Sequence, residues 1–160
     1  MSQRHAVYPG SFDPVTLGHI DILERASGLF DRVTVLVANS GKAGLLPIEK
    51  RVELFCQSTA HLKNVKVAPF QGLLVDEVRR QKAVAVIRGI RTAGDYEHEW
   101  SLAGVNALLA PDMETIYFLA RPATAAISSS LVRDVIKHGD NLARNLEKLV
   151  PAPVIAALTK

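Results

Sequence analysis

Short runs of consecutive apolar residues alternate along the chain with longer segments in which apolar residues recur every three or four positions. The short runs are typical of strands that are buried on both faces of a parallel sheet, and the longer segments are typical of amphipathic helices. We expect a turn at Pro9-Gly10, directly after the first strand. The five predicted strands are Arg4–Tyr8, Val33–Ala38, Val65–Pro69, Val84–Ile87 and Thr115–Ala120.

Helical periodicity fills the intervals between these strands and continues after the last one. In the first helix, Ile20, Leu23, Ala26 and Phe30 share one face. Strands that alternate with helices predict an α/β fold with a doubly wound five-stranded parallel sheet, in a single domain over residues 1–160 with helices at its C-terminal end. The predicted helices are Thr16–Phe30, one that begins near Pro47, Leu73–Gln81, Asp95–Ala110, Ser128–His138, Leu142–Val150 and Pro153–Leu158.

Composition and charge exclude several classes of protein. The chain has 160 residues, of which 48% are hydrophobic and 22% charged, so it is not a disordered chain. The formal net charge is +3, but no basic run is longer than Arg79-Arg80, so we expect neither a nucleic-acid partner nor a membrane surface. No apolar run approaches the ~18 residues of a membrane span, and no signal-peptide pattern follows the first residues, which predicts a cytoplasmic protein.

The single cysteine carries no predicted chemistry. One cysteine cannot form an intramolecular disulfide or supply a cysteine-based zinc site. Cys56 lies on the apolar stripe of the helix that begins near Pro47, together with Val52 and Phe55. We therefore expect Cys56 to be a small core residue.

Candidate chemistry lies in the loops after the strands, because ligands of a doubly wound sheet bind beyond the carboxyl ends of its strands. After the first strand, the loop ends in Thr16-Leu-Gly-His19. Thr16 and His19 are three residues apart at the start of a helix, so they share a face at its positive end, where anions bind. Taken alone, this short pattern is explained better by a helix cap at Thr16 and a surface histidine.

The loops after the fourth and fifth strands suit phosphate groups. Arg88 and Arg91 flank Gly89 at a strand end, and each guanidinium can bind phosphate oxygens bidentately. The following acidic residues include Asp95, which fits the first turn of a helix, and Glu99, which that explanation does not cover. Ser128–Ser130 open the helix after the fifth strand; capping needs one serine, so we expect the other hydroxyls and the unpaired N–H groups to bind a polyphosphate.

Together these segments resemble the phosphopantetheine adenylyltransferase family of the Rossmann-like nucleotidyltransferase superfamily. The resemblance rests on Gly-Ser-Phe-Asp-Pro followed by Thr-x-Gly-His, on Arg-Gly-x-Arg with Asp-Tyr-Glu-x-Glu, and on Ile-Ser-Ser-Ser, in this order over Arg4–Leu158. Thr16 stands where the superfamily usually has histidine, as in this family. The chain departs from the family pattern with Ser11 in place of the common threonine, with Lys50 in place of glutamate, and with small residues over Thr124–Ala126.

The resemblance implies transfer of AMP from ATP to 4′-phosphopantetheine, with Mg²⁺ carried on the ATP phosphates. It implies catalytic roles for His19, Lys42 and Arg91. It implies that the phosphopantetheine site contains Ser11, Lys42, Leu74 and Arg88. It implies that the ATP site contains Ser11, Phe12, Thr16, His19, Gly89, Ile90, Arg91, Glu99, Thr124, Ala125, Ala126, Ile127, Ser128, Ser129 and Ser130.

Two other functions stay open. One alternative is a nucleotidyltransferase with a mononucleotide or another phosphate acceptor, against which Lys42 and the Arg88–Glu99 string argue. The other is a nucleotide-binding regulatory module without turnover.

The family implies a homo-oligomer, a hexamer, with coenzyme A as a feedback ligand. The helix Asp95–Ala110 independently indicates an oligomer, because apolar positions on two of its sides require two partners.

Overall fold

The computed structural model describes residues 3–39 and 44–159. Within these residues, five parallel strands form one sheet in the order β3-β2-β1-β4-β5, which confirms the predicted doubly wound α/β fold. The chain order places β1 in the centre, where the direction of strand addition reverses. The strands are β1 (His5–Gly10), β2 (Arg32–Ala38), β3 (Val65–Phe70), β4 (Ala85–Ile90) and β5 (Glu114–Leu119).

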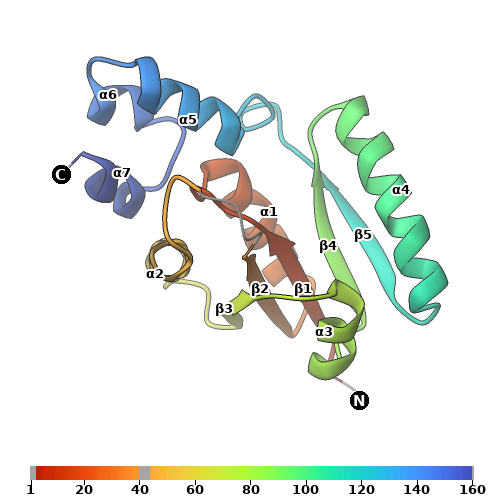
Figure 1. Cartoon of the computed structure of the whole chain (residues 1–160). Coiled ribbons are helices and arrows are strands. Elements are labelled where there is room, and N and C mark those ends of the chain that lie inside the picture. The colour runs from red at the N-terminus through yellow and green to blue at the C-terminus, as the bar shows by residue number, and fades with distance from the viewer. Residues whose placement is uncertain (1–2, 40–43, 160) are drawn as a thin grey trace.

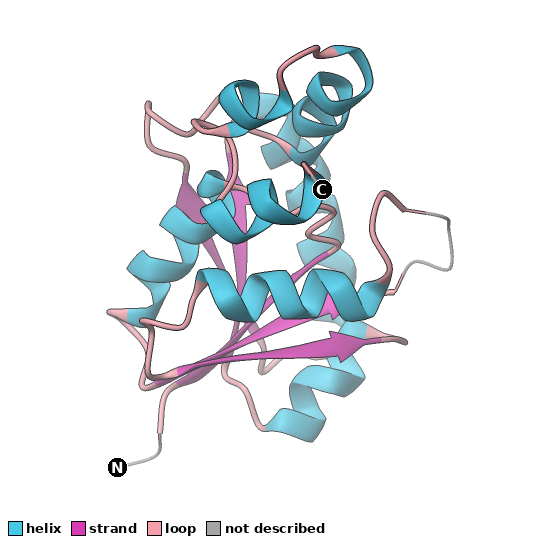
Figure 2. Ribbon diagram, turned by 90° about the vertical axis from the view of Figure 1, so that its left-hand side faces the viewer, coloured by secondary structure: helices cyan, strands magenta, loops and turns pink. Residues whose placement is uncertain are grey.

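Helices cover both faces of this sheet (Figures 1 and 2). The larger core lies between the sheet and α1, α2 and α5–α7. A smaller core lies on the opposite face and includes residues of α3 together with Ala110 and Met113, which follow α4. In the described part of the chain, no helix combines the length and the apolar character needed to cross a membrane. The helices are α1 (Leu17–Ser27), α2 (Ile48–Ser58), α3 (Leu74–Gln81), α4 (Ala93–Leu109), α5 (Ser129–His138), α6 (Leu142–Leu146) and α7 (Ala152–Leu158).

The predicted turn at Pro9-Gly10 is wrong, because β1 continues through both residues. Pro9 lies opposite Leu36 and Gly10 lies opposite Val37 in the register with β2. A proline within a strand loses one ladder hydrogen bond, which is tolerated here because β4 no longer pairs with β1 at this level. Gly10 is required for another reason: a Cβ at this position would lie 2.7 Å from Cζ of Phe12, whose ring folds back over the strand.

The predicted core position of Cys56 is also wrong, because its side chain is exposed. Helix α2 instead buries Arg51, Leu54 and Phe55. Arg51 does not belong to the apolar stripe of this helix, but its guanidinium donates hydrogen bonds to the backbone carbonyls of Ser11 and Ala38. The buried face of α2 therefore includes Arg51, and Cys56 lies outside that face.

The sheet divides beside its central strand. Strands β1 and β2 share six residue pairs, whereas in the described chain β1 and β4 share two, Ala6 with Ala85 and Val7 with Val86. Beyond these pairs the two strands diverge toward their carboxyl ends (Figure 1). A crevice at this point of a doubly wound sheet is where ligands of such folds bind.

Candidate active site

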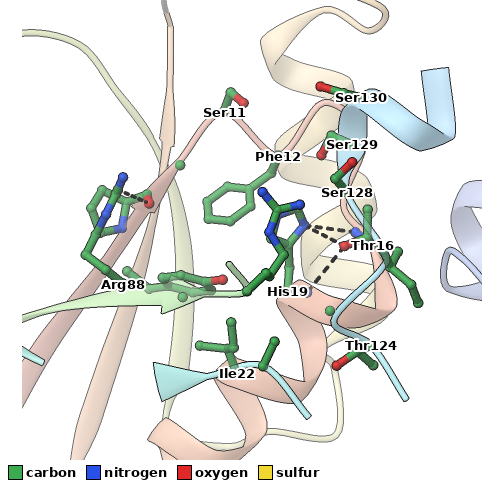
Figure 3. Close-up of a pocket in the computed structure, with 18 of the residues that line it drawn as sticks. Ser11, Phe12, Thr16, His19, Ile22, Arg88, Thr124, Ser128, Ser129 and Ser130 are labelled. Carbon is green, nitrogen blue, oxygen red and sulfur yellow. Dashed lines mark hydrogen bonds between the residues drawn. The ribbon is translucent and has the colours of Figure 1, made fainter. Parts of the chain in front are cut away.

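A pocket of about 330 Å³ opens between the diverging ends of β1 and β4. In Figure 3, Arg88 lies on one side of the pocket and the three serines on the other, with Phe12 and His19 between them. The structure thus brings together residues from all the loops that we predicted on β1, β4 and β5. The predicted site residues that line the pocket are Ser11, Phe12, Thr16, His19, Arg88, Gly89, Arg91, Glu99, Thr124, Ile127, Ser128, Ser129 and Ser130.

Four predicted site residues lie elsewhere in the described structure, and one lies outside it. Leu74 lines a separate cavity of about 150 Å³, whose wall includes Arg88 and Glu99 from the first pocket. Ile90, Ala125 and Ala126 do not line the main pocket, and Ile90 is buried. Lys42 lies outside the described residues.

The pocket is also lined by Tyr8 and Arg133, which were not among the predicted site residues. Tyr8 is 4% exposed and belongs to the apolar run of a buried strand. The sequence pattern predicts a core residue at this position and carries no signal that the residue also lines the pocket. Arg133 donates from Nη1 to the carbonyl of Asp13 at 2.7 Å and from Nη2 to Ser130 Oγ at 3.0 Å. Its spacing of three residues from Ser130 was the available signal, because such residues share a helix face.

His19 caps its own helix and keeps one ring nitrogen for the pocket. The backbone N–H of Thr16 donates to His19 Nδ1 at 3.0 Å, and the N–H of His19 donates to Thr16 Oγ1 at 3.4 Å (Figure 3). Burial of the ring, together with the nearby positive charge of Arg91, lowers the pKa of His19 to about 4. At neutral pH the imidazole is therefore uncharged, and with Nδ1 accepting a hydrogen bond its proton is on Nε2.

The phenyl ring of Phe12 packs edge-to-face against that imidazole and restricts its orientation. The centroids of the Phe12 and His19 rings are 5.0 Å apart at an interplanar angle of 89°. On its other side, Phe12 packs edge-to-face on Phe55 of α2 at 4.7 Å. Phe12 is 3% exposed, so it serves as a packed support beneath the pocket that links His19 to the core.

Arg88 is held by Glu99. The Arg88 Nε donates to Glu99 Oε2 at 2.6 Å, Nη2 donates to Glu99 Oε1, and Nη1 donates to the carbonyl of Pro9 at 3.1 Å. This bidentate pair orients the guanidinium and leaves one N–H on each Nη for a ligand, since arginine has five N–H donors. Glu99 thus acts on Arg88, a contact that the sequence did not indicate.

Arg91 is attached to the first turn of α4. Thr92 caps the helix, and the Asp95 carboxylate accepts hydrogen bonds from the Arg91 backbone N–H at 3.0 Å and from Arg91 Nε and Nη2, each at 3.1 Å. Burial raises the pKa of Asp95, but the hydrogen bonds from Arg91 and Thr92 outweigh it and lower that pKa overall. The predicted place of Asp95 in the first turn of a helix is confirmed, and its carboxylate in addition takes part in the helix cap and holds Arg91.

All three serine hydroxyls at the start of α5 have protein partners, but within the described part of the chain those of Ser128 and Ser130 act only as acceptors and keep their own O–H for a ligand. Ser128 Oγ accepts the N–H of Leu131 at 3.0 Å and caps the helix. Ser129 Oγ donates to the carbonyl of Pro14 at 2.9 Å, and Ser130 Oγ accepts from Arg133. In the described structure, the backbone N–H groups of Ser129 and Ser130 have no protein partner. These N–H groups lie at the positive end of α5, a position that favours an anion.

Close packing explains the glycine between the two arginines. A Cβ on Gly89 would lie 2.3 Å from Ile22 Cδ1, so any larger residue here would require the end of the Ile22 side chain to move. Among the described residues, the pocket carries Arg88, Arg91 and Arg133 against Glu99 as its formally charged side chains, because His19 is neutral. This excess of positive charge favours an anionic ligand.

Comparison with known proteins then identifies the family. The family described as cytidylyltransferase-like matches residues 7–135. Phosphopantetheine adenylyltransferase of Haemophilus influenzae (strain 86-028NP) is 45% identical, over 95% of this chain and 96% of that protein. The protein of the same name from Proteus mirabilis (strain HI4320) is 40% identical, over 99% of both chains. This chain belongs to the phosphopantetheine adenylyltransferase family.

Solved structures of other proteins share the fold of this phosphopantetheine adenylyltransferase family member. A Vibrio parahaemolyticus chain assigned as a nicotinate-nucleotide adenylyltransferase superposes with a TM-score of 0.71 at 17% identity, over 99% of this chain and 100% of that one. The lipopolysaccharide core biosynthesis protein of Thermoplasma volcanium superposes with a TM-score of 0.56 at 23% identity, over 75% and 99%. At such identities the likeness establishes the fold alone. Family membership makes this chain a nucleotidyltransferase.

Proposed function

We propose that this protein transfers the AMP group of ATP to the phosphate of 4′-phosphopantetheine, forming dephospho-coenzyme A and pyrophosphate. A phosphate oxygen of the acceptor attacks the α-phosphorus of ATP, and the bond from that phosphorus to the α,β-bridging oxygen breaks as pyrophosphate leaves. The observation that carries the proposal is the convergence of Arg88, Arg91, His19 and the N-terminus of α5 on one pocket. Because the attacking phosphate is already ionised, the reaction needs positioning and charge stabilisation rather than a general base.

The two cavities that share Arg88 in their walls suit the two ends of the acceptor. The free N–H groups of Arg88 would bind its phosphate, with Lys42 as a second cation and Ser11 beside them. The smaller cavity, lined by Leu74 and Leu102 among others, begins at the same arginine. The elongated pantetheine arm would lie there, so that a single guanidinium fixes the phosphate at the boundary between arm and nucleotide.

The opposite side of the main pocket suits the nucleotide. Arg91 and the N–H groups of Ser129 and Ser130 would hold the β- and γ-phosphates and then the leaving pyrophosphate. The Nε2–H of neutral His19 would donate to the α-phosphate oxygens as negative charge develops on them. His19 transfers no proton in this scheme.

Mg²⁺ belongs to the substrate in this proposal, since hard oxygen ligands on the triphosphate carry it into the site. Among the described residues, no group of three or more histidine, cysteine, aspartate or glutamate side chains is arranged to hold a metal ion. Removal of Mg²⁺ with EDTA should therefore abolish AMP transfer without lowering the melting temperature of the ligand-free protein. A fall in that melting temperature would indicate a metal that is bound by the protein itself.

The proposal includes a cytoplasmic homo-oligomer, with the hexamer taken from the family resemblance. Its support in the structure is α4, which contains no buried residue in the described chain and exposes Trp100, Val105 and Leu108 to 65%, 55% and 83%. An apolar surface of this kind is typical of an interface. Light scattering should give a multiple of the 17.4 kDa chain mass, and a 17.4 kDa particle at micromolar concentration would contradict the assembly.

Exchange of labelled pyrophosphate into ATP tests the reaction directly. With dephospho-coenzyme A and Mg²⁺, we expect saturable exchange. Exchange that requires another adenylylated acceptor, such as nicotinate adenine dinucleotide, would support a different acceptor, and no exchange with any acceptor would leave a nucleotide-binding module. Coenzyme A contains the phosphopantetheine group, so as a feedback ligand it should inhibit competitively with 4′-phosphopantetheine.

A further inference from the structure

The side chain of Arg51 is a buried cation that bonds to backbone rather than to a carboxylate. It is 6% exposed, and in the described part of the chain it forms no ion pair and its Nε has no partner. Its Nη1 donates to the carbonyl of Ser11 at 2.7 Å and to the carbonyl of Ala38 at 3.1 Å. Burying a charge without a counter-charge opposes folding, so apolar packing would fill this position more favourably if stability were its only role.

The carbonyl that Arg51 holds belongs to a peptide at the pocket. In a trans peptide the C=O and N–H groups point in opposite directions, so a hydrogen bond from Arg51 to the Ser11 carbonyl turns the Phe12 N–H away from Arg51. Ser11 and Phe12 line the pocket, whereas Arg51 lies outside its lining. The Phe12 N–H has no protein partner in the described structure. It is therefore a free donor on the pocket side of the loop.

Backbone strain at Phe12 shows that this orientation must be imposed. Phe12 has a φ of +47°, a left-handed conformation that a bulky residue rarely adopts without surrounding support. Two other carbonyls of the same loop are held from α5, those of Asp13 by Arg133 and of Pro14 by Ser129. The Ser11 carbonyl accepts a hydrogen bond from the Arg51 side chain. Loss of Arg51 thus frees the Ser11–Phe12 peptide to rotate while the rest of the loop stays anchored.

We propose that Arg51 is a positioning residue for adenylyl transfer, which fixes the Ser11–Phe12 peptide so that the Phe12 N–H binds a phosphate group in the pocket. Arg51 acts through this peptide and does not touch the substrate. The inference rests on the proposed function for the identity of the phosphate group. It adds a backbone donor opposite the N–H groups of Ser129 and Ser130 and explains why a charged side chain occupies the core side of α2.

Substitution of Arg51 tests the proposal by kinetics. Arg51→Met keeps the apolar stem and removes the donors, and we expect kcat/KM for ATP to fall by about 10- to 100-fold, below the loss for a full oxyanion donor. The KM for 4′-phosphopantetheine should change less than about threefold, because Arg88 holds that substrate. Arg51→Lys keeps the charge but lacks the planar fork that reaches two carbonyls, so it should fall between the parent and Arg51→Met.

A matched variant separates positioning from stability. Leu54→Ala lies in the same helix, at a residue that is 2% exposed, and removes no hydrogen bond to the loop. It should lower the melting temperature and leave kcat/KM for ATP within about twofold of the parent while the protein is folded. Loss of kcat/KM in Leu54→Ala to the same extent as in Arg51→Met would overturn the proposal. A crystal structure of Arg51→Met that retains the positive φ at Phe12 would also overturn it.

Binding of inorganic pyrophosphate with Mg²⁺, measured by calorimetry, needs no turnover. We expect pyrophosphate to bind the parent at least tenfold more tightly than Arg51→Met. Equal affinities, or no binding to the parent, would overturn the role of Arg51. A parent that binds pyrophosphate but does not adenylylate 4′-phosphopantetheine would instead contradict the proposed function and leave the role of Arg51 standing.

Discussion

Replacing His19 separates two tasks that its imidazole performs at opposite nitrogens. Nδ1 accepts the hydrogen bond from the Thr16 N–H, and Nε2 carries the proton that we expect to face the α-phosphate. His19→Asn places an amide oxygen near the position of Nδ1 and has no group that reaches the position of Nε2. His19→Gln extends an amide N–H to about the position of Nε2. His19→Ala removes both groups.

The two losses should differ in magnitude. Loss of the capping acceptor costs about 1 kcal/mol of folding free energy, the usual contribution of a helix cap. Loss of a donor to developing transition-state charge costs about 2.7–4 kcal/mol, or roughly 10²–10³ in kcat. We therefore expect His19→Asn to lose kcat as His19→Ala does, but to melt near the parent. His19→Gln should retain kcat within about tenfold of the parent and lose stability.

Steady-state AMP transfer to 4′-phosphopantetheine measures these outcomes, with folding of each variant checked by thermal melting. The KM for the acceptor should change less than about threefold, because Arg88 and not His19 holds it. A kcat for His19→Asn within about threefold of the parent, which is less than 1 kcal/mol, would remove Nε2 from the mechanism. A parent kcat that rises as pH falls through 6.5 would show that the imidazolium acts, contrary to the lowered pKa.

Three further predictions follow from buried contacts. The pKa of His19 is about 4 in the folded protein and 6.5 in the unfolded chain, so the unfolded chain binds more protons between these two pH values. The contribution of His19 to folding stability should therefore be complete above pH 6.5 and fall by up to about 3 kcal/mol as the pH drops toward 4. Urea melts of the parent and of His19→Asn at several pH values should show this difference. Arg88→Ala should raise the KM for 4′-phosphopantetheine more than tenfold and lower the melting temperature, because Glu99 is left without its partner; an unchanged KM would exclude Arg88 from that site. Gly89→Ala should destabilise by about 1–3 kcal/mol through Ile22 Cδ1, and less in an Ile22→Val background that lacks this atom, whereas additive losses in a double-mutant cycle would contradict the packing argument.

Element type was predictable because hydrophobic period differs between strands and helices. The boundaries of the elements were less predictable. Thr16, predicted as the first residue of a helix, is its N-cap, and this helix, predicted to reach Phe30, ends at Ser27. The Pro9-Gly10 pair carried the signature of a turn, but the register with β2 holds both residues in the strand. Strand order could not be read from local pattern, since it depends on contacts between segments far apart in sequence.

The positions of the site loops were predictable because the carboxyl ends of neighbouring parallel strands meet at one edge of the sheet. The partners of individual side chains were not. Arg88 and Glu99 are eleven residues apart, on a strand and a helix whose angle no periodicity specifies. The hydroxyl of Ser129 meets a carbonyl 115 residues away at Pro14. A buried arginine such as Arg51 contradicts the polarity pattern on which its helix face was predicted, so the structure was needed to find it.

Because β1 and β4 pair over only a short stretch, a ligand bound at this point also affects how firmly the two sides of the sheet are held together. Among the residues that the structure describes, two pairs join β1 to β4 and so the three-stranded side of the sheet to the β4–β5 side, and the pocket opens beyond them. A nucleotide that contacts Ser11 on one side and Arg91 on the other bridges the division that the backbone leaves open. Arg88 Nη1 already donates to the Pro9 carbonyl across this division, so such a ligand adds to an existing contact, and we expect it to stabilise the sheet further.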